Sequence, residues 1–157
     1  MDRETAVNAE ERLRALGIGL PDPPKPLGAY VEAVPVGELL FLSGVLPVEN
    51  GTLKFSGRIG SELTVEDGRA AARLAALNAL ALARVHLGSL NEVKRVVRLA
   101  VSLVAVAEFR EHAKVADGAS EVLRDVFGAE KTSVRMVTGA LSLPAGATVV
   151  VELILAI

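Results

Sequence analysis

The segment KTSVRMVTGALSLP, at residues 131–144, places one arginine, Arg135, inside a run that is typical of a β-strand. A Pro-Ala-Gly turn follows it, and the run from Thr148 to Ile157 is almost unbroken Val, Leu and Ile. These features predict a strand–turn–strand unit, with the arginine strand beside the final strand in the sheet interior. An arginine there requires an anionic partner. That partner is either a carboxylate of the protein, with Glu152 as one candidate, or the carboxylate of a ligand.

Hydrophobic periodicity and turn residues predict the other elements of the chain. They are a helix at 3–16, a Pro-rich connector at 17–26, strands at 30–34 and 39–43, a helix from Thr64 to Gly88, a strand at 94–107 and a helix at 108–127. Thr64 and Asp67 have the spacing of a capping box. Gly118, inside the last helix, costs about 1 kcal/mol relative to alanine. After the first helix, the order is therefore β-β-α-β-α-β.

The strand at 94–107 is apolar on both of its faces. One face carries Val97, Leu99, Val101 and Leu103, and the other carries Val96, Ala100, Val104 and Val106. A strand of this kind is covered on both sides. We expect the helices of the domain on one side, and a neighbouring subunit is a candidate for the other.

The 157-residue chain is 51% hydrophobic and 23% charged, which fits one globular domain. Its net charge of −2 argues against a general nucleic-acid binder, which usually carries a basic patch. There is no cysteine, and the two histidines, His86 and His112, are expected at the surface or an interface, so no metal site is predicted. Without a signal-peptide pattern or a purely apolar run of bilayer length, we expect a soluble cytoplasmic protein with no membrane partner.

Two early segments and the arginine segment resemble the RidA (YjgF) family. Residues 27–34 read LGAYVEAV and residues 40–47 read LFLSGVLP, which resembles the N-terminal signature of that family. Arg135, nine residues before Pro144, matches the active-site arginine of the family, and Glu152 matches an acidic residue of its last strand. The resemblance covers residues 27–157 as a single domain. The helix and connector at 1–26 resemble an extension found in one branch of the family.

The resemblance implies an α/β (α+β) fold similar to chorismate mutase, with a mixed sheet and two helices on one face. It also implies a homotrimer, in which the sheets form a central barrel and the sites lie between subunits. Family members hydrolyse reactive enamines and imines, such as 2-aminoacrylate, to 2-keto acids and ammonia without a cofactor. Other members carry the name endoribonuclease, but this chain offers no histidine pair, metal-ligand cluster or basic run to support that activity.

The candidate site residues are Tyr30, Ser43, Gly44, Arg135 and Glu152. The Arg135 guanidinium has the shape and permanent charge to bind a substrate carboxylate, so it is the candidate catalytic residue. The Tyr30 phenol and the Ser43 hydroxyl could contact the substrate or water, and Gly44 would let the backbone approach a ligand. Each of these three also has a plain structural reading, as packing or as a turn.

One position departs from the family pattern. The last strand of the well-studied deaminases carries two acidic residues two positions apart, and here the matching pair is Val150 and Glu152. Val150 cannot accept a proton from the attacking water. The sequence therefore supports binding of a small 2-imino or 2-keto acid more strongly than rapid hydrolysis. A trimeric carboxylate-binding protein with little catalysis is the alternative to a deaminase.

Overall fold

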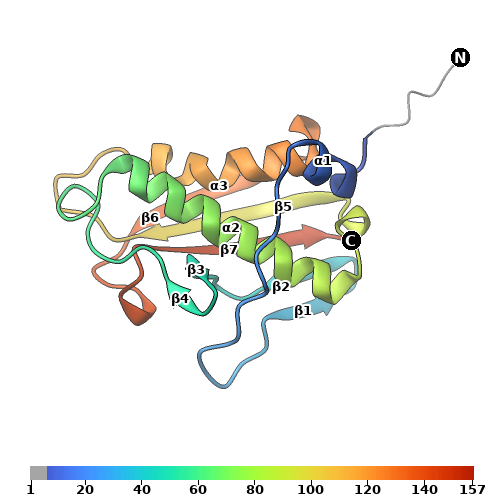
Figure 1. Cartoon of the computed structure of the whole chain (residues 1–157), viewed down its shortest axis with the longest axis horizontal. Helices are drawn as coiled ribbons and strands as arrows, with labels where there is room; N and C mark the ends of the chain where they lie inside the picture. The colour runs from blue at the N-terminus through green and yellow to red at the C-terminus, as the bar shows by residue number, and fades with distance from the viewer. Residues whose placement is uncertain (1–6) are drawn as a thin grey trace, which may run out of the picture.

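The computed structural model describes residues 7–157 and shows a mixed sheet with two long helices on one face (Figure 1). The main sheet has the order β1-β2-β7-β5-β6, and only the β5–β6 pair is parallel. Its strands are β1 (Ala33–Val36), β2 (Leu39–Leu42), β7 (Val149–Ala156), β5 (Arg95–Leu103) and β6 (Val134–Gly139). A small hairpin consists of β3 (Val48–Glu49) and β4 (Thr52–Leu53). The predicted fold class is confirmed.

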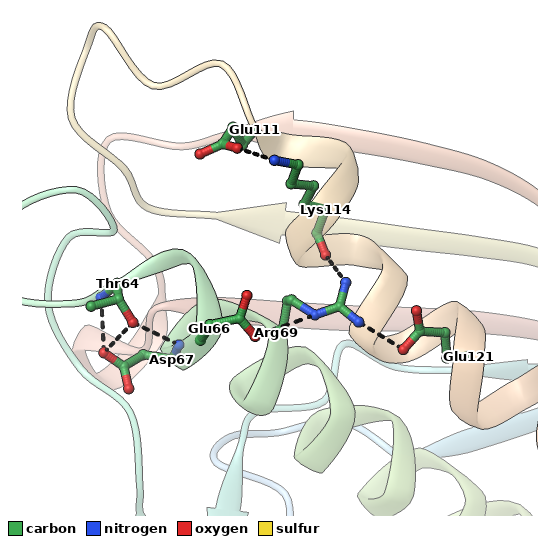
Figure 2. Close-up of polar contacts among 7 residues, drawn as sticks. All are labelled: Thr64, Glu66, Asp67, Arg69, Glu111, Lys114 and Glu121. Atoms are coloured by element: carbon green, nitrogen blue, oxygen red, sulfur yellow. Dashed lines mark hydrogen bonds and ion pairs between the residues drawn. The ribbon is translucent and has the colours of Figure 1, made fainter.

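The helices are α1 (Ala9–Ala15), α2 (Val65–Leu87) and α3 (His112–Phe127), with 3-10 turns η1 (Leu90–Glu92), η2 (Ala129–Lys131) and η3 (Pro144–Gly146). The capping box predicted for α2 is present, because Thr64 and Asp67 exchange hydrogen bonds across the helix start (Figure 2). Of the helix predicted at 3–16, the part before residue 7 lies outside the described residues. α3 begins later than predicted, because residues 108–111 lie before its first turn.

The prediction that the arginine strand lies beside the final strand was wrong. β6 is an edge strand, and β5 lies between it and β7. Val134 is 70% exposed and Met136 54%, so β6 lacks the burial of an interior strand. β7, which is apolar except for Glu152, instead takes the middle of the sheet, where both of its edges are paired.

β5 also differs from its predicted alternation. A bulge between Val96 and Arg98 shifts the register, so Val96 and Leu99 both face the helices although they are three residues apart. Simple alternation placed Val97 on the same face as Leu99, but in the structure Val97 is not part of that buried face. The strand ends at Leu103 rather than Ala107, and its other face is half-buried in the single chain.

α2 lies against the sheet through a row of fully buried alanines, which lets its axis approach closely. They are Ala71, Ala72, Ala75, Ala76, Ala79 and Ala83. By length and composition α2 could cross a membrane, but 56% of its apolar window is buried inside the protein. Burial of this kind is typical of the core helix of a soluble protein.

α2 and α3 meet at Gly118, where a Cβ atom would lie 2.1 Å from the carbonyl oxygen of Arg69. The Arg69 side chain crosses the same gap and donates to the carbonyl oxygen of Lys114 at 2.9 Å. It also pairs with Glu121 at 2.7 Å and Glu66 at 3.7 Å (Figure 2). The glycine that disfavours the helix locally is thus the residue that allows the two helices to touch.

The N-terminal extension is attached to the domain by polar contacts of Glu10 and by the burial of Ala9 and Leu13 in the core. Glu10 of α1 pairs with Arg84 at 2.7 Å and accepts from the Leu90 N–H at 2.9 Å. Burial alone would raise the pKa of the Glu10 carboxyl, but the Leu90 N–H and the Arg84 guanidinium hold it below its ordinary value. The connector then passes across α2 (Figure 1), and the Leu27 N–H donates to the Tyr30 hydroxyl at 3.0 Å.

We expect Gly118→Ala to destabilise the protein by at least about 2 kcal/mol, although alanine gains roughly 1 kcal/mol in helix propensity. The added methyl group meets backbone, which cannot move aside. Gly19→Ala is the control, because no neighbouring atom of the described residues lies within 4 Å of the Cβ added there. Urea unfolding at one protein concentration ranks the two. Equal stability of both variants would contradict the close contact.

Candidate functional site

Three of the predicted site residues, Tyr30, Ser43 and Gly44, line one open cavity of about 540 Å³. Val150, the position that departs from the family pattern, lines it too. Ser102 adds a third hydroxyl. The remaining lining residues are Leu27, Leu46, Leu143 and Pro144. We call this cavity the depression; within residues 7–157, its lining holds hydroxyl groups and apolar side chains but no charged one.

The backbone around the depression is fixed by the sheet. The Ser43 N–H donates to the Glu32 carbonyl at 2.8 Å, and Val45 exchanges both backbone hydrogen bonds with Val151. Ser102 and Val150 are register partners on β5 and β7. Both lie on the sheet face away from α2 and α3, because their strand neighbours Val101 and Val151 are buried beneath the helices.

Gly44 is required by the close approach of Val150. A Cβ atom at residue 44 would lie 2.9 Å from Cγ1 of Val150. The branched side chain at 150 therefore fills space that any other residue at 44 would need. This contact is a structural reason for the glycine, beside its predicted role in ligand approach.

Arg135 lies outside the depression, at the edge of the sheet. It is the register partner of Leu99 in the parallel ladder, so its side chain points to the helix face. Its Nη1 donates to Asp117 Oδ1 at 2.7 Å and to Ser120 Oγ at 3.0 Å, both on α3. Within residues 7–157, the other guanidinium nitrogens of Arg135 make no hydrogen bond. The arginine therefore has an anionic partner in its own chain, and one side of its fork stays open.

Glu152 is on the opposite face of the sheet from Arg135. It is the register partner of Ala100 and pairs with Arg98 at 3.5 Å, with half of its side chain exposed. The pairing of Arg135 with Glu152, one of the readings of the sequence, is therefore not formed. A single chain brings Tyr30, Ser43 and Gly44 together and leaves Arg135 and Glu152 apart from each other.

Sequence reasoning missed four residues that shape these two areas: Leu27, Ser102, Asp117 and Ser120. Asp117 and Ser120 are three apart on α3, and therefore share a helix face, which is the one signal that could have linked them to a common partner. His112 lies at the start of α3 with its ring 5.1 Å from that of Phe109. In the described part of the chain, no group of three or more His, Asp or Glu side chains is arranged to hold a metal ion.

Comparison with known proteins finds one family model that matches residues 10–157, described as "YjgF/chorismate mutase-like, putative endoribonuclease". Protein TCP17 of Trypanosoma cruzi is 40% identical over 141 residues, which are 89% of this chain and 88% of that protein. A crystal structure from Shewanella oneidensis, named as a "putative endoribonuclease", is 35% identical with a TM-score of 0.92, and the match covers 96% of this chain and 99% of that one. RidA from an Antarctic Psychrobacter is 26% identical with a TM-score of 0.60, covering 87% and 92%.

We expect Gly44→Ala to lower the free energy of unfolding by about 1–3 kcal/mol, because the new methyl group overpacks against Val150. Adding Val150→Ala removes the Cγ atom that the methyl group meets, so the double variant should recover part of the loss. Thermal unfolding of both single variants and the double variant gives the interaction free energy between positions 44 and 150. Strictly additive losses would contradict a direct contact between the two positions.

Proposed function

Because the chain belongs to the YjgF/chorismate mutase-like family, we propose that it hydrolyses 2-imino and enamine acids to 2-keto acids and ammonia. Arg135 binds the substrate carboxylate in this proposal. The observation that carries it is the arrangement of the guanidinium, which Asp117 and Ser120 hold through Nη1 alone. The open side of the guanidinium can donate to both oxygens of a carboxylate. Binding there orients the substrate before it reacts, which lowers the entropic part of the reaction barrier.

The site of this proposal lies between copies of the chain. Arg135 faces the helix side at the β6 edge, whereas the depression opens on the other face of the sheet, so one chain alone does not unite them. An unpaired β6 edge and exposed apolar residues on the open face support association of copies. These residues include Val34 (45% exposed), Phe41 (39%) and Met136 (54%). A closed ring gives every copy the same two contacts, and we propose the homotrimer in the cytoplasm.

The chemistry needs little beyond positioning. Water adds to the carbon of the C=N bond, the nitrogen takes up protons, and the resulting carbinolamine releases ammonia to leave the keto acid. Because the C=N carbon is already electrophilic, no cofactor is required. The Tyr30 hydroxyl accepts from the Leu27 N–H and keeps its own proton to donate, and the Ser43 hydroxyl offers a second group to orient the substrate nitrogen or water. The proposed substrate-binding groups are thus Tyr30, Ser43, Gly44 and Arg135.

A second candidate function is binding of small carboxylates without useful turnover, and Val150 is the observation that favours it. In the described part of the chain, no carboxylate that could take a proton from water lines the depression. Glu152, the other acid of the matching pair, is paired with Arg98. Both candidate functions use Arg135 in the same way, so they differ in rate and not in ligand.

The test is hydrolysis of an imine generated from an amino acid by an amino acid oxidase, followed through the loss of the semicarbazide-trapped imine. We expect acceleration over the spontaneous rate and a drop of about 100-fold in kcat/KM for Arg135→Ala, because a carboxylate loses its charged partner. Arg73→Ala is the control, since Arg73 is an exposed arginine of α2 with no side-chain partner among the described residues.

Three outcomes separate the alternatives. If the folded protein does not accelerate hydrolysis but still binds a keto acid in calorimetry, the result favours carboxylate binding without turnover. No binding of any small carboxylate contradicts both functions. An equal rate for Arg135→Ala and Arg73→Ala would remove Arg135 from the site.

A further inference from the structure

Leu27 is an apolar side chain that the fold holds in an exposed position. It is 67% exposed, although it directly follows the Pro-rich connector and is not at a free end of the chain. Its N–H donates to the Tyr30 hydroxyl at 3.0 Å, and the Tyr30 N–H donates to the Gly28 carbonyl at 3.0 Å. Pro26 precedes it and stiffens the backbone. The Leu27 side chain is therefore presented at a fixed place, and no side chain among residues 7–157 covers it.

That place is the wall of the depression. Leu27 lines the depression and also a smaller neighbouring cavity, whose lining includes Lys25 and Glu32. Tyr30, Ser43 and Gly44 line both cavities. The other apolar lining residues of the depression are Leu46, Leu143, Pro144 and Val150. A volume of about 540 Å³ is within the range of small-molecule sites.

The lining decides which substrate side chains suit the depression. A charged side chain would lose water there without meeting an opposite charge, since none of the described residues that line the depression is charged. A methylene or methyl group, as in 2-aminoacrylate or the alanine-derived imine, would leave most of the apolar wall in contact with water. An isobutyl or thioether side chain would cover it and gain the free energy of apolar burial.

We propose that the depression binds the side chain of the substrate and that Leu27 makes the site selective for 2-imino acids with apolar side chains of about four heavy atoms. This inference rests on the proposed function, because it assumes that the carboxylate is held by Arg135. It assigns a specificity-determining role to Leu27, the residue that directly follows the Pro-rich connector.

The test compares kcat/KM for imines made from leucine, methionine, alanine and glutamate, using the full chain. A hydrophobic pocket discriminates by roughly ten-fold or more per methylene, so the leucine-derived imine should exceed the alanine-derived one by at least about ten-fold. Leu27→Ala should reduce kcat/KM for the leucine-derived imine by about ten-fold and leave the alanine-derived imine nearly unchanged. Val31→Ala is the matched control, because Val31 is 64% exposed near the same turn but does not line the depression.

A binding measurement keeps the inference separate from catalysis. Calorimetry with 4-methyl-2-oxopentanoate and pyruvate should show tighter binding of the branched keto acid, and Leu27→Ala should remove most of the difference. Equal affinity for the two keto acids, or the same effect from Leu27→Ala and Val31→Ala, would overturn the role of Leu27 while the proposed function stands. Failure to bind either keto acid, without hydrolysis of any imine, would overturn both.

Discussion

The close contact of α3 with α2 at Gly118 is the constraint on which the arginine site depends. The absence of a side chain at 118 lets the Arg69 carbonyl lie against α3. The Arg69 guanidinium then links the two helices by donating to the Lys114 carbonyl and to the Glu121 carboxylate. Asp117 adjoins this contact, and Ser120 lies in the next turn. Their hydrogen bonds to Arg135 are therefore set by the packing of two helices and not by the edge strand itself. A destabilising residue for the isolated helix thus helps to position Arg135.

The second half of the proposed site depends on different contacts. Gly44 accommodates Val150, and the register of β5 with β7 places Ser102 beside it. The Tyr30 hydroxyl accepts from the Leu27 N–H and so holds Leu27 at the depression. None of the described residues that line the depression is charged, and Arg135 would supply the positive charge that a carboxylate needs. The two halves are complementary in chemistry but face opposite sides of one sheet. That geometry is the main physical support for a site shared between copies of the chain.

Much of the fold could be predicted from local sequence signals, because capping and periodicity are local properties. Thr64 with Asp67 marked the start of α2, Gly88 marked its end, and the hairpin of β1 and β2 followed from its turn. The place of β6 could not be predicted in this way, because strand order depends on which edges pair across the whole sheet. The bulge between Val96 and Arg98 was not predicted either, because alternation alone does not reveal an inserted residue.

Within the candidate site, the residue types were easier to predict than the face of the sheet on which each side chain lies. The sequence identified Tyr30, Ser43 and Gly44, which the structure brings together, and Arg135, which it places on another face. The partners of Arg135 are on a separate helix, and their identity depends on the packing at Gly118. The wall formed by Leu27 depends on the path of the connector, which composition described as stiff but could not orient.

A complementation experiment tests the shared site most directly. Arg135→Ala leaves the depression intact, and Ser43→Phe fills the depression while leaving Arg135 intact, so each variant alone should be inactive. Co-expressed with different tags and purified as mixed assemblies, the two should regain roughly a third of wild-type activity, because one interface of a mixed trimer carries both intact halves. Mixed assemblies as inactive as the separate variants would contradict a site built from two copies.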